Sequence, residues 1–226
     1  MSNVSRHPDA NFLLDFASGG LSAAQAIAVS AHLHFCSSCR SQAESLNDIG
    51  GRLLADVEPA VLSANCQAAV FAALDSPVPV KAEIERRPAE VVRGLTRSDQ
   101  LPALVRQITP VDGLRWRRLS SSLQVARLPV GEQRYELALH HIEAGGKAPA
   151  HDHRGTEITV VLQGSFSDEA GVYHQGDFMV CEPGYTHTPV ATANAECVCL
   201  SVLEAPIRLV GGFKRLLNPF LSFRPA

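Results

Sequence analysis

Four side chains that favour metal coordination, spread over two glycine-bracketed stretches, constrain the fold of this 226-residue chain most strongly. The two stretches read Gly145-x5-His151-x-His153-x3-Glu157-x6-Gly164 and Gly176-Asp177-x5-Pro183-Gly184-x2-His187. Because residues two apart on a strand point to the same face, His151 and His153 can both face the interior of a β barrel. Glu157 follows four residues later, and His187 arrives from a later hairpin. The spacing therefore predicts a cluster of nitrogen and oxygen donors around one divalent metal ion.

These four side chains have an alternative interpretation, in which they only fill a metal-free barrel. Burying three imidazoles and a carboxylate without partners leaves polar groups unsatisfied and costs folding free energy, so a metal site is favoured. The donor set suits Zn²⁺, and alternatively Fe²⁺, Mn²⁺ or Ni²⁺. A closed zinc site with four ligands would be structural, whereas Fe²⁺ with vacant positions would be ready to bind O₂.

The C-terminal part of the chain is predicted to form an antiparallel β structure. From residue 114 on, short apolar runs are divided by Gly, Pro and Asp, which is typical of a sandwich or barrel. In residues 211–226, Pro219 interrupts an apolar run, which indicates a strap over the barrel surface rather than a membrane anchor. The expected strands cover residues 114–119, 123–128, 135–142, 157–163, 165–168, 171–174, 177–181, 187–190 and 197–203.

The first 80 residues or so are predicted to form about four short helices. Ser22 and Gln25 have the spacing of a capping box, which opens the second helix. Leu53 and Leu54 are expected to face inward in the third helix, and Cys66 is expected in the core of the fourth. The other expected helices cover residues 9–17, about 40–56 and about 63–74.

A second candidate metal site lies in the helical part, in the sequence His32-Leu-His-Phe-Cys36-Ser-Ser-Cys39. His32 and Cys36 are four residues apart and share a helix face, and Cys39 lies one turn beyond, where Ser37 and Ser38 can start the next helix. Structural zinc requires a fourth ligand, for which His7 is favoured because the first helix must pack on the second. His34 points away from His32 and is the weaker choice. The alternative is a redox or buried cysteine pair, but the histidine spacing favours zinc.

The barrel ligand pattern resembles the two sequence motifs of the cupin superfamily, over roughly residues 110–205. The second motif departs from the family pattern, because Ala191 replaces an asparagine and Pro183 is adjacent to Gly184. Neither difference affects a ligand, so the metal prediction stands. The resemblance implies a jelly-roll barrel of six to ten strands, with the motif residues His151, His153, Glu157 and His187 as ligands.

Residues 5–75 resemble the zinc-binding anti-sigma domain, whose signature is His-x3-Cys-x2-Cys with an upstream histidine. Combined with a cupin, they make the chain similar to the ChrR type of anti-sigma factor. The resemblance implies that the helical part binds an extracytoplasmic-function-type sigma factor and keeps it from RNA polymerase. It also implies that the barrel senses an oxidative signal, singlet oxygen or peroxide, and then releases the sigma factor. The zinc ligands that it implies in the helical part are His7, His32, Cys36 and Cys39.

A proline-rich segment separates the two predicted parts. Residues 76–88 contain three prolines and mixed charge, which indicates an extended and fairly stiff linker. We therefore expect an α+β chain of two domains, with a linker at residues 77–92. A small zinc-pinned helical bundle would occupy residues 1–76, and an antiparallel jelly-roll barrel of the cupin type would occupy residues 93–226.

The charge distribution bears on the kind of partner. Residues 1–80 hold seven acidic and three basic side chains, a balance of 3 − 7 = −4, whereas the whole chain has a net charge of −3. No basic arm or stripe supports direct nucleic-acid binding, and the acidic helical part suits a partner with basic surfaces. No signal pattern and no apolar run of about 20 residues indicates secretion or a membrane span, so we expect a cytoplasmic protein.

The competing hypothesis is a cupin dioxygenase or isomerase with a helical appendage, which would need an open metal position and a general base. Tyr135, His140 and His141 lie on one predicted strand that can line a pocket, but alternation allows only one of the two histidines to face inward. Cys197 and Cys199 are expected to be buried small residues. We favour the regulator over the enzyme, because the two metal signatures occur together.

Overall fold

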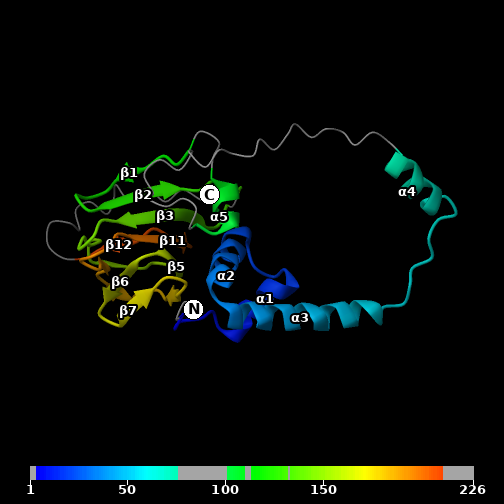
Figure 1. Ribbon diagram of the computed structural model, residues 1–226, viewed down its shortest axis with the longest axis horizontal. Coiled ribbons are helices and arrows are strands. Elements are labelled where there is room, and N and C mark those ends of the chain that lie inside the picture. Colours follow the sequence, from blue (N-terminus) through cyan, green and yellow to red (C-terminus); the bar gives the residue numbers. More distant parts are fainter. Residues whose placement is uncertain (1–3, 76–100, 110–112, 132, 211–226) are drawn as a thin grey trace.

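The computed structural model describes residues 4–75, 101–109, 113–131 and 133–210. Helices come first along the chain, and an antiparallel β structure follows (Figure 1). The expected linker at residues 77–92 and the expected strap at residues 211–226 lie outside the described residues. The domain boundaries therefore stay a prediction.

Local capping interactions set the ends of the first helices. The side chain of Asp9 accepts a hydrogen bond from the backbone N–H of Phe12, and the first helix stops at Gly19, which has a φ of 74°. The capping box predicted from Ser22 and Gln25 is present at the start of the second helix. The described helices are α1 (Ala10–Ser18), α2 (Ala23–Phe35), α3 (Ser37–Ala55), α4 (Cys66–Asp75) and α5 (Ala103–Ile108).

The helix α3 begins at Ser37, where the sequence allows a helix start, and its N-cap is a cysteine. Cys36 is the N-cap of α3, and its sulfur accepts a hydrogen bond from the backbone N–H of Cys39 at 3.4 Å. The start predicted from the apolar period, near residue 40, is therefore three residues late, whereas the start at Ser37 and Ser38 is confirmed. Cysteine is not among the usual N-cap residues, so the capping residue itself was not predicted.

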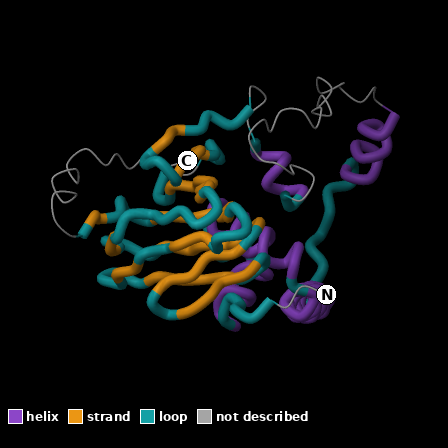
Figure 2. The backbone as a smooth tube through the Cα atoms, turned by 60° about the vertical axis from the view of Figure 1, so that its left-hand side comes forward, coloured by secondary structure: helices purple, strands orange, loops and turns teal. Residues whose placement is uncertain are grey.

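The strands form three antiparallel sheets. One sheet has six strands in the order β1-β2-β3-β11-β5-β8, and two smaller sheets have the orders β10-β6-β7 and β12-β4-β9. Together they make an antiparallel sandwich rather than a closed barrel (Figure 2). The strands are β1 (Arg117–Arg118), β2 (Leu123–Arg127), β3 (Glu136–Ile142), β4 (His151–Asp152), β5 (Glu157–Gln163), β6 (Ser165–Asp168), β7 (Gly171–His174), β8 (Phe178–Cys181), β9 (Thr186–His187), β10 (Val190–Ala191), β11 (Cys197–Leu203) and β12 (Arg208–Leu209).

Several short elements differ from the prediction. The strand expected at residues 187–190 is two short strands, β9 and β10, because Pro189 between them has no backbone N–H to donate. The strands β4 and β12 have two residues each, and α5 has six. Elements this short hold too few side chains to show a period, so the sequence did not predict them.

The outer face of the six-stranded sheet is buried under the helices. Alternate residues of β5 and β11 face opposite sides, so Val160 and Leu200 share a cluster with Val29 of α2. Their neighbours Val161 and Cys199 belong instead to the inner cluster of the sandwich. Figure 2 shows the helices gathered on one side of the strand layers. The helical part and the sheet therefore share one apolar core.

A second group of apolar side chains remains exposed. Figure 1 shows α4 standing apart from the rest, and α4 has no buried residue. The predicted inward positions of Leu53, Leu54 and Cys66 are wrong, since the two leucines are 65% and 74% exposed and Cys66 is only partly buried. No described segment covers the C-terminal half of α3. We define the open apolar surface by its members, Ile49, Leu53, Leu54, Val57, Val61, Leu62, Val70, Phe71 and Leu74.

The length and apolarity of the helices bear on membrane insertion. Among the described residues, no single helix is long and apolar enough to cross a bilayer. The helices α1 and α2 meet the requirement only when taken together, and they are bent by 114° at the break between them.

We predict that Leu200→Ala lowers the free energy of unfolding by about 2–5 kcal/mol, because the fully buried side chain leaves a cavity between the sheet and the helices. Since helices and sheet share this core, the helical and tertiary circular dichroism signals should be lost in one transition at lower urea concentration. Val172→Ala, at a position that is 47% exposed, should change the free energy by less than about 0.5 kcal/mol. A Leu200→Ala midpoint equal to that of the wild type would contradict the shared core.

Two candidate metal centres

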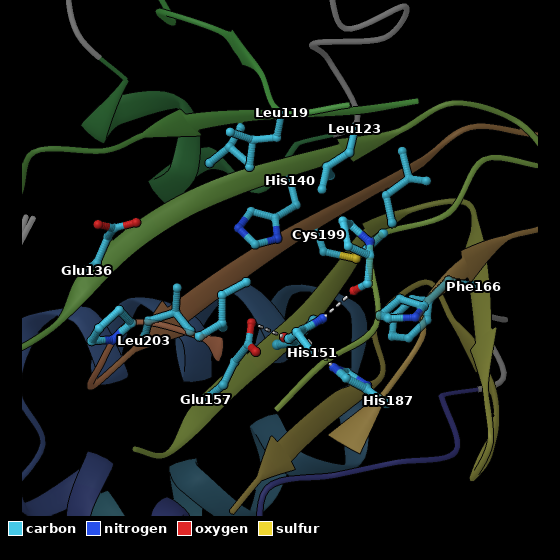
Figure 3. Close-up of a pocket in the computed structure, with 18 of the residues that line it drawn as sticks. Leu119, Leu123, Glu136, His140, His151, Glu157, Phe166, His187, Cys199 and Leu203 are labelled. Carbon is cyan, nitrogen blue, oxygen red and sulfur yellow. Dashed lines mark hydrogen bonds between the residues drawn. The ribbon is translucent and has the colours of Figure 1, made fainter. Parts of the chain in front are cut away.

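The structure brings together the four residues predicted to bind a metal in the C-terminal part, here called the barrel cluster: His151, His153, Glu157 and His187. His151 on β4 and His187 on β9 are directly opposed in the sheet register, and Glu157 begins β5. One potential ligand atom from each of these residues and from His153 lies within 4.8 Å of the others, and all four residues are buried. Figure 3 shows His151, Glu157 and His187 converging below the cavity.

Hydrogen bonds outside the cluster orient two of its imidazoles. The Nδ1 atom of His151 donates to the carbonyl oxygen of Pro149 at 2.8 Å, and the Nδ1 atom of His187 donates to the carboxylate of Asp168 at 3.0 Å. In neutral rings that donate from Nδ1, both Nε2 atoms carry a lone pair, yet they lie 3.1 Å apart, and His153 Nε2 lies 3.2 Å from His187 Nε2. Lone pairs this close repel one another unless a cation lies between them, so the cluster fits a metal ion.

The protonation states of the barrel cluster also suit a metal ion. Burial lowers the pKa of His151 to about 4, although the Glu157 carboxylate and the Pro149 carbonyl oppose the shift. For Glu157, burial raises the pKa, but the neighbouring histidines, led by His153, outweigh it and bring the pKa to about 2. Neutral imidazole and ionised carboxylate are the forms that bind metals.

A cavity of about 160 Å³ opens beside the cluster. Most of its wall is apolar, while His140 and Glu136 add polar groups (Figure 3). The prediction that only one of two adjacent histidines faces inward is confirmed, because His140 lines the cavity and His141 pairs with Glu196 at 2.9 Å. Tyr135 does not line the cavity and belongs to the core that faces the helices.

The structure also brings the four predicted residues of the helical site together. The Nδ1 atom of His7 lies 3.4 Å from the sulfur of Cys36 and 3.3 Å from that of Cys39. These three residues and His32 offer ligand atoms within 4.8 Å of one another, and all except His7 are buried. His34, the weaker alternative, stacks edge-on against the ring of the neighbouring phenylalanine and is not in the cluster.

His32 provides a direct test of whether this cluster fits a metal. Its Nδ1 atom donates to the carbonyl oxygen of Gly176 at 2.7 Å, and its Nε2 atom is buried without a hydrogen-bond partner. Burial lowers the pKa of His32 and keeps the ring neutral, although the Gly176 carbonyl opposes the shift. A buried lone pair on a fixed, neutral imidazole is what a metal ligand requires.

The two thiols complete a donor set that can hold zinc. Burial, together with the neighbouring Cys36 thiol, raises the pKa of Cys39 to about 12. A bound divalent cation deprotonates such thiols outright, which removes the cost of burying them as polar groups. Two sulfurs and two imidazole nitrogens form a common tetrahedral zinc set.

Sequence reasoning missed the residues that support the ligands. Asp168 and Pro149 orient the barrel imidazoles, and Gly176 orients His32. Pro149 is only two residues from His151, but its carbonyl belongs to the backbone, so no residue type in the sequence marks it. Asp168 and Gly176 come from other strands or turns and have no fixed spacing from the histidines that they orient, so no motif reveals them. For Gly176, the only available signal was its place next to Asp177 in the second barrel motif.

Three of the other four cysteines lie in the sandwich core. Cys197 and Cys199 are buried as predicted, with their sulfur atoms 3.6 Å apart. Cys199 lines the cavity, and Cys181 is buried in the same inner cluster. Burial raises the pKa of Cys181, which keeps its thiol protonated.

Comparisons with known proteins agree with this architecture. Residues 105–205 match a family model described as "ChrR Cupin-like domain", and the matched range includes all four residues of the barrel cluster. The anti-sigma-E factor ChrR of Cereibacter sphaeroides is 33% identical to this chain, over 96% of this chain and 98% of that protein.

A solved structure gives the same result for the fold. The crystal structure of Rhodobacter sphaeroides SigE in complex with the anti-sigma ChrR matches with a TM-score of 0.70 and 31% sequence identity, covering 89% of this chain and 99% of that chain. The predicted fold, N-terminal helices followed by an antiparallel β structure of the cupin type, is thereby confirmed. The predicted resemblance holds along almost the whole chain, and the chain belongs to the ChrR family of anti-sigma factors.

Proposed function

We propose that the helical part of this chain binds and sequesters an extracytoplasmic-function-type sigma factor. The observation that carries this proposal is the 33% identity to an anti-sigma factor over 96% of the chain. The similar solved structure, in which an anti-sigma factor is in complex with SigE, supports it. Holding a sigma factor away from RNA polymerase places the complex in the cytoplasm, and it requires neither direct nucleic-acid binding nor membrane contact.

The open apolar surface supports a protein partner for the helices. Its nine large apolar side chains are each at least half exposed, a cost that a folded protein normally avoids unless a partner covers them. The acidic balance of residues 1–80 suits a sigma factor, because the surfaces that bind DNA and polymerase are basic. We infer that α4 and the C-terminal half of α3 contact the sigma factor.

We further propose a structural role for zinc in the helical part. A Zn²⁺ ion held by His7, His32, Cys36 and Cys39 would contribute on the order of 10 kcal/mol to the folding of α1, α2 and α3. The unpartnered Nε2 atom of His32 supports this assignment. The barrel cluster would hold a second ion, which we propose is Zn²⁺, with Fe²⁺, Mn²⁺ or Ni²⁺ as alternatives.

The β sandwich is the proposed sensor. We infer that an oxidative signal, singlet oxygen or peroxide, changes the metal cluster formed by His151, His153, Glu157 and His187 and so releases the sigma factor. The cavity beside this cluster supports the inference, because a small oxidant could reach the ligands through it. The cavity is also the feature that favours the competing dioxygenase or isomerase hypothesis.

We predict that the double variant Phe71→Ser/Leu74→Ser raises the Kd for the sigma factor at least about tenfold, or about 1.4 kcal/mol, because it removes two apolar anchors from the interface. The probe is each extracytoplasmic-function-type sigma factor encoded in the same genome, tested by co-purification and then by calorimetry. Gln67→Ala, at an exposed polar position of α4, is the matched control and should bind as the wild type does. Complete absence of a complex with the wild-type chain would reject the proposed function.

We predict that zinc binding at the helical cluster weakens as the pH falls. The cluster contains two thiols, and the pKa of Cys39 is raised, so binding releases about two protons and the affinity falls by up to about 100-fold for each pH unit between about pH 8 and pH 7. Chelator competition at several pH values measures this slope. The Cys36→Ser/Cys39→Ser variant should lose it, together with the cooperative unfolding of the helices.

We predict two bound zinc ions for each chain, without consumption of O₂ by the purified protein. Elemental analysis of protein expressed without added zinc, together with an oxygen electrode, separates the two hypotheses. One zinc and one iron with sustained O₂ consumption would instead favour the dioxygenase.

A further inference from the structure

The N-terminal segment that carries His7 is hydrogen-bonded to the β sandwich. The carboxylate of Asp177 accepts hydrogen bonds from the backbone N–H groups of Ser5 at 2.7 Å and Arg6 at 3.0 Å, and Asp177 is only 1% exposed. The backbone N–H of Phe178 in turn donates to the carbonyl oxygen of Arg6 at 3.0 Å. The segment therefore lies along the edge strand β8, and His7 follows directly after the last of these contacts.

The same turn of the sandwich holds a second ligand of the helical cluster. The carbonyl oxygen of Gly176 accepts the Nδ1–H of His32 at 2.7 Å, and the ring of Phe178 lies 5.8 Å from the His32 ring. A hydrogen bond of this kind fixes the tautomer and the rotation of a ligating imidazole. The Nε2 atom of His32 consequently faces the sulfurs in one defined direction.

The approach of this turn to the helices leaves no room for a side chain at residue 176. Gly176 has a φ of +92°, and a Cβ atom there would lie 2.7 Å from the Cβ of Phe35 and 2.7 Å from a methyl carbon of Val4. Phe35 immediately precedes Cys36, and Val4 lies three residues before His7. Any displacement of this turn would therefore move the chain next to two ligands.

Strand β8 also contacts the other metal cluster. Met179 lines the cavity beside His151 and Glu157, whereas its neighbour Phe178 faces the helices. Cys181, two residues further on, is paired with Glu157 in the sheet register. Alternate residues of one four-residue strand thus face the helical centre on one side and the cavity beside the barrel cluster on the other.

From these contacts we propose that the turn formed by Gly176, Asp177 and Phe178 is a positioning element of the helical metal centre. It places the imidazoles of His7 and His32, while Cys36 and Cys39 are placed by the start of α3. The affinity of the helical cluster for its metal then depends on the position of β8, and a change in the barrel cluster reaches the helical centre through this strand. The inference rests on the proposed metal site in the helical part.

The test uses the full-length chain and Co²⁺ as the probe. Only the helical cluster contains cysteine ligands, so a sulfur-to-cobalt charge-transfer band reports that cluster alone, and total bound Co²⁺ reports both. Asp177→Ala should weaken Co²⁺ binding at the thiolate site roughly 10–100-fold, the usual effect of losing a group that orients a ligand. Asp177→Asn keeps an acceptor oxygen and should recover part of the loss.

A matched control replaces a carboxylate elsewhere in the sandwich. Glu196 accepts hydrogen bonds from His141 and from Gln163, so Glu196→Gln perturbs the sheet without touching the turn. It should leave the thiolate–cobalt affinity within about twofold of the wild type.

The outcomes separate the positioning proposal from the metal assignment. An unchanged thiolate–cobalt affinity in Asp177→Ala overturns the positioning role. If Asp177→Ala fails to fold, Gly176→Ala decides in its place, since its added Cβ pushes the turn away from Phe35 and Val4, and wild-type affinity there overturns the proposal equally. If the wild-type chain shows no thiolate–cobalt band at all, the metal assignment itself fails.

Discussion

Burial of the outer face of the six-stranded sheet is the interaction on which the rest of the structure depends. Leu137, Leu139 and Leu200 on that face are completely buried, and the helices cover it. About 25 cal/mol of stabilisation for each Å² of apolar surface removed from water makes separation of the two layers costly. Because the layers stay together, the candidate metal cluster of the helical part lies at the interface between the helices and the sheet. One member of that cluster, His32, is consequently hydrogen-bonded to the sheet through Gly176.

The candidate sites were predictable because their spacing is local. His151 and His153 are two apart, and His32 and Cys36 are four apart, so the geometry of one strand or one helix turn already places each pair. His7 has no local spacing to the others and was inferred from the need to pack the first two helices and from the upstream histidine that the family resemblance implies. The supporting groups could not be inferred, since Asp168 lies 19 residues from His187 and the Gly176 carbonyl lies 144 residues from His32. Their proximity is a product of tertiary structure.

For the fold as well, features set by neighbouring residues could be predicted, and features set by distant contacts could not. Strands β5, β6, β7 and β11 have the bounds that apolar runs and turn residues predict. The strands β5 and β11 are long enough to show a clear apolar run, and glycines mark the ends of β6 and β7. Side-chain period alone placed Leu53, Leu54 and Cys66 inward, and that prediction failed. Period identifies the apolar face of a helix, but it does not say whether the surface that covers this face belongs to the same chain or to another one.

The open apolar surface has a consequence for the life of the protein outside a complex. A chain with Phe71, Leu74 and seven similar side chains in water presents the features that chaperones and proteases recognise in incompletely folded proteins. Self-association through the same side chains competes with this removal, at a rate that rises with concentration. Copies of this chain in excess of the proposed sigma factor would therefore be degraded or precipitate. This removal would keep the cellular amounts of this chain and of the sigma factor close to equal.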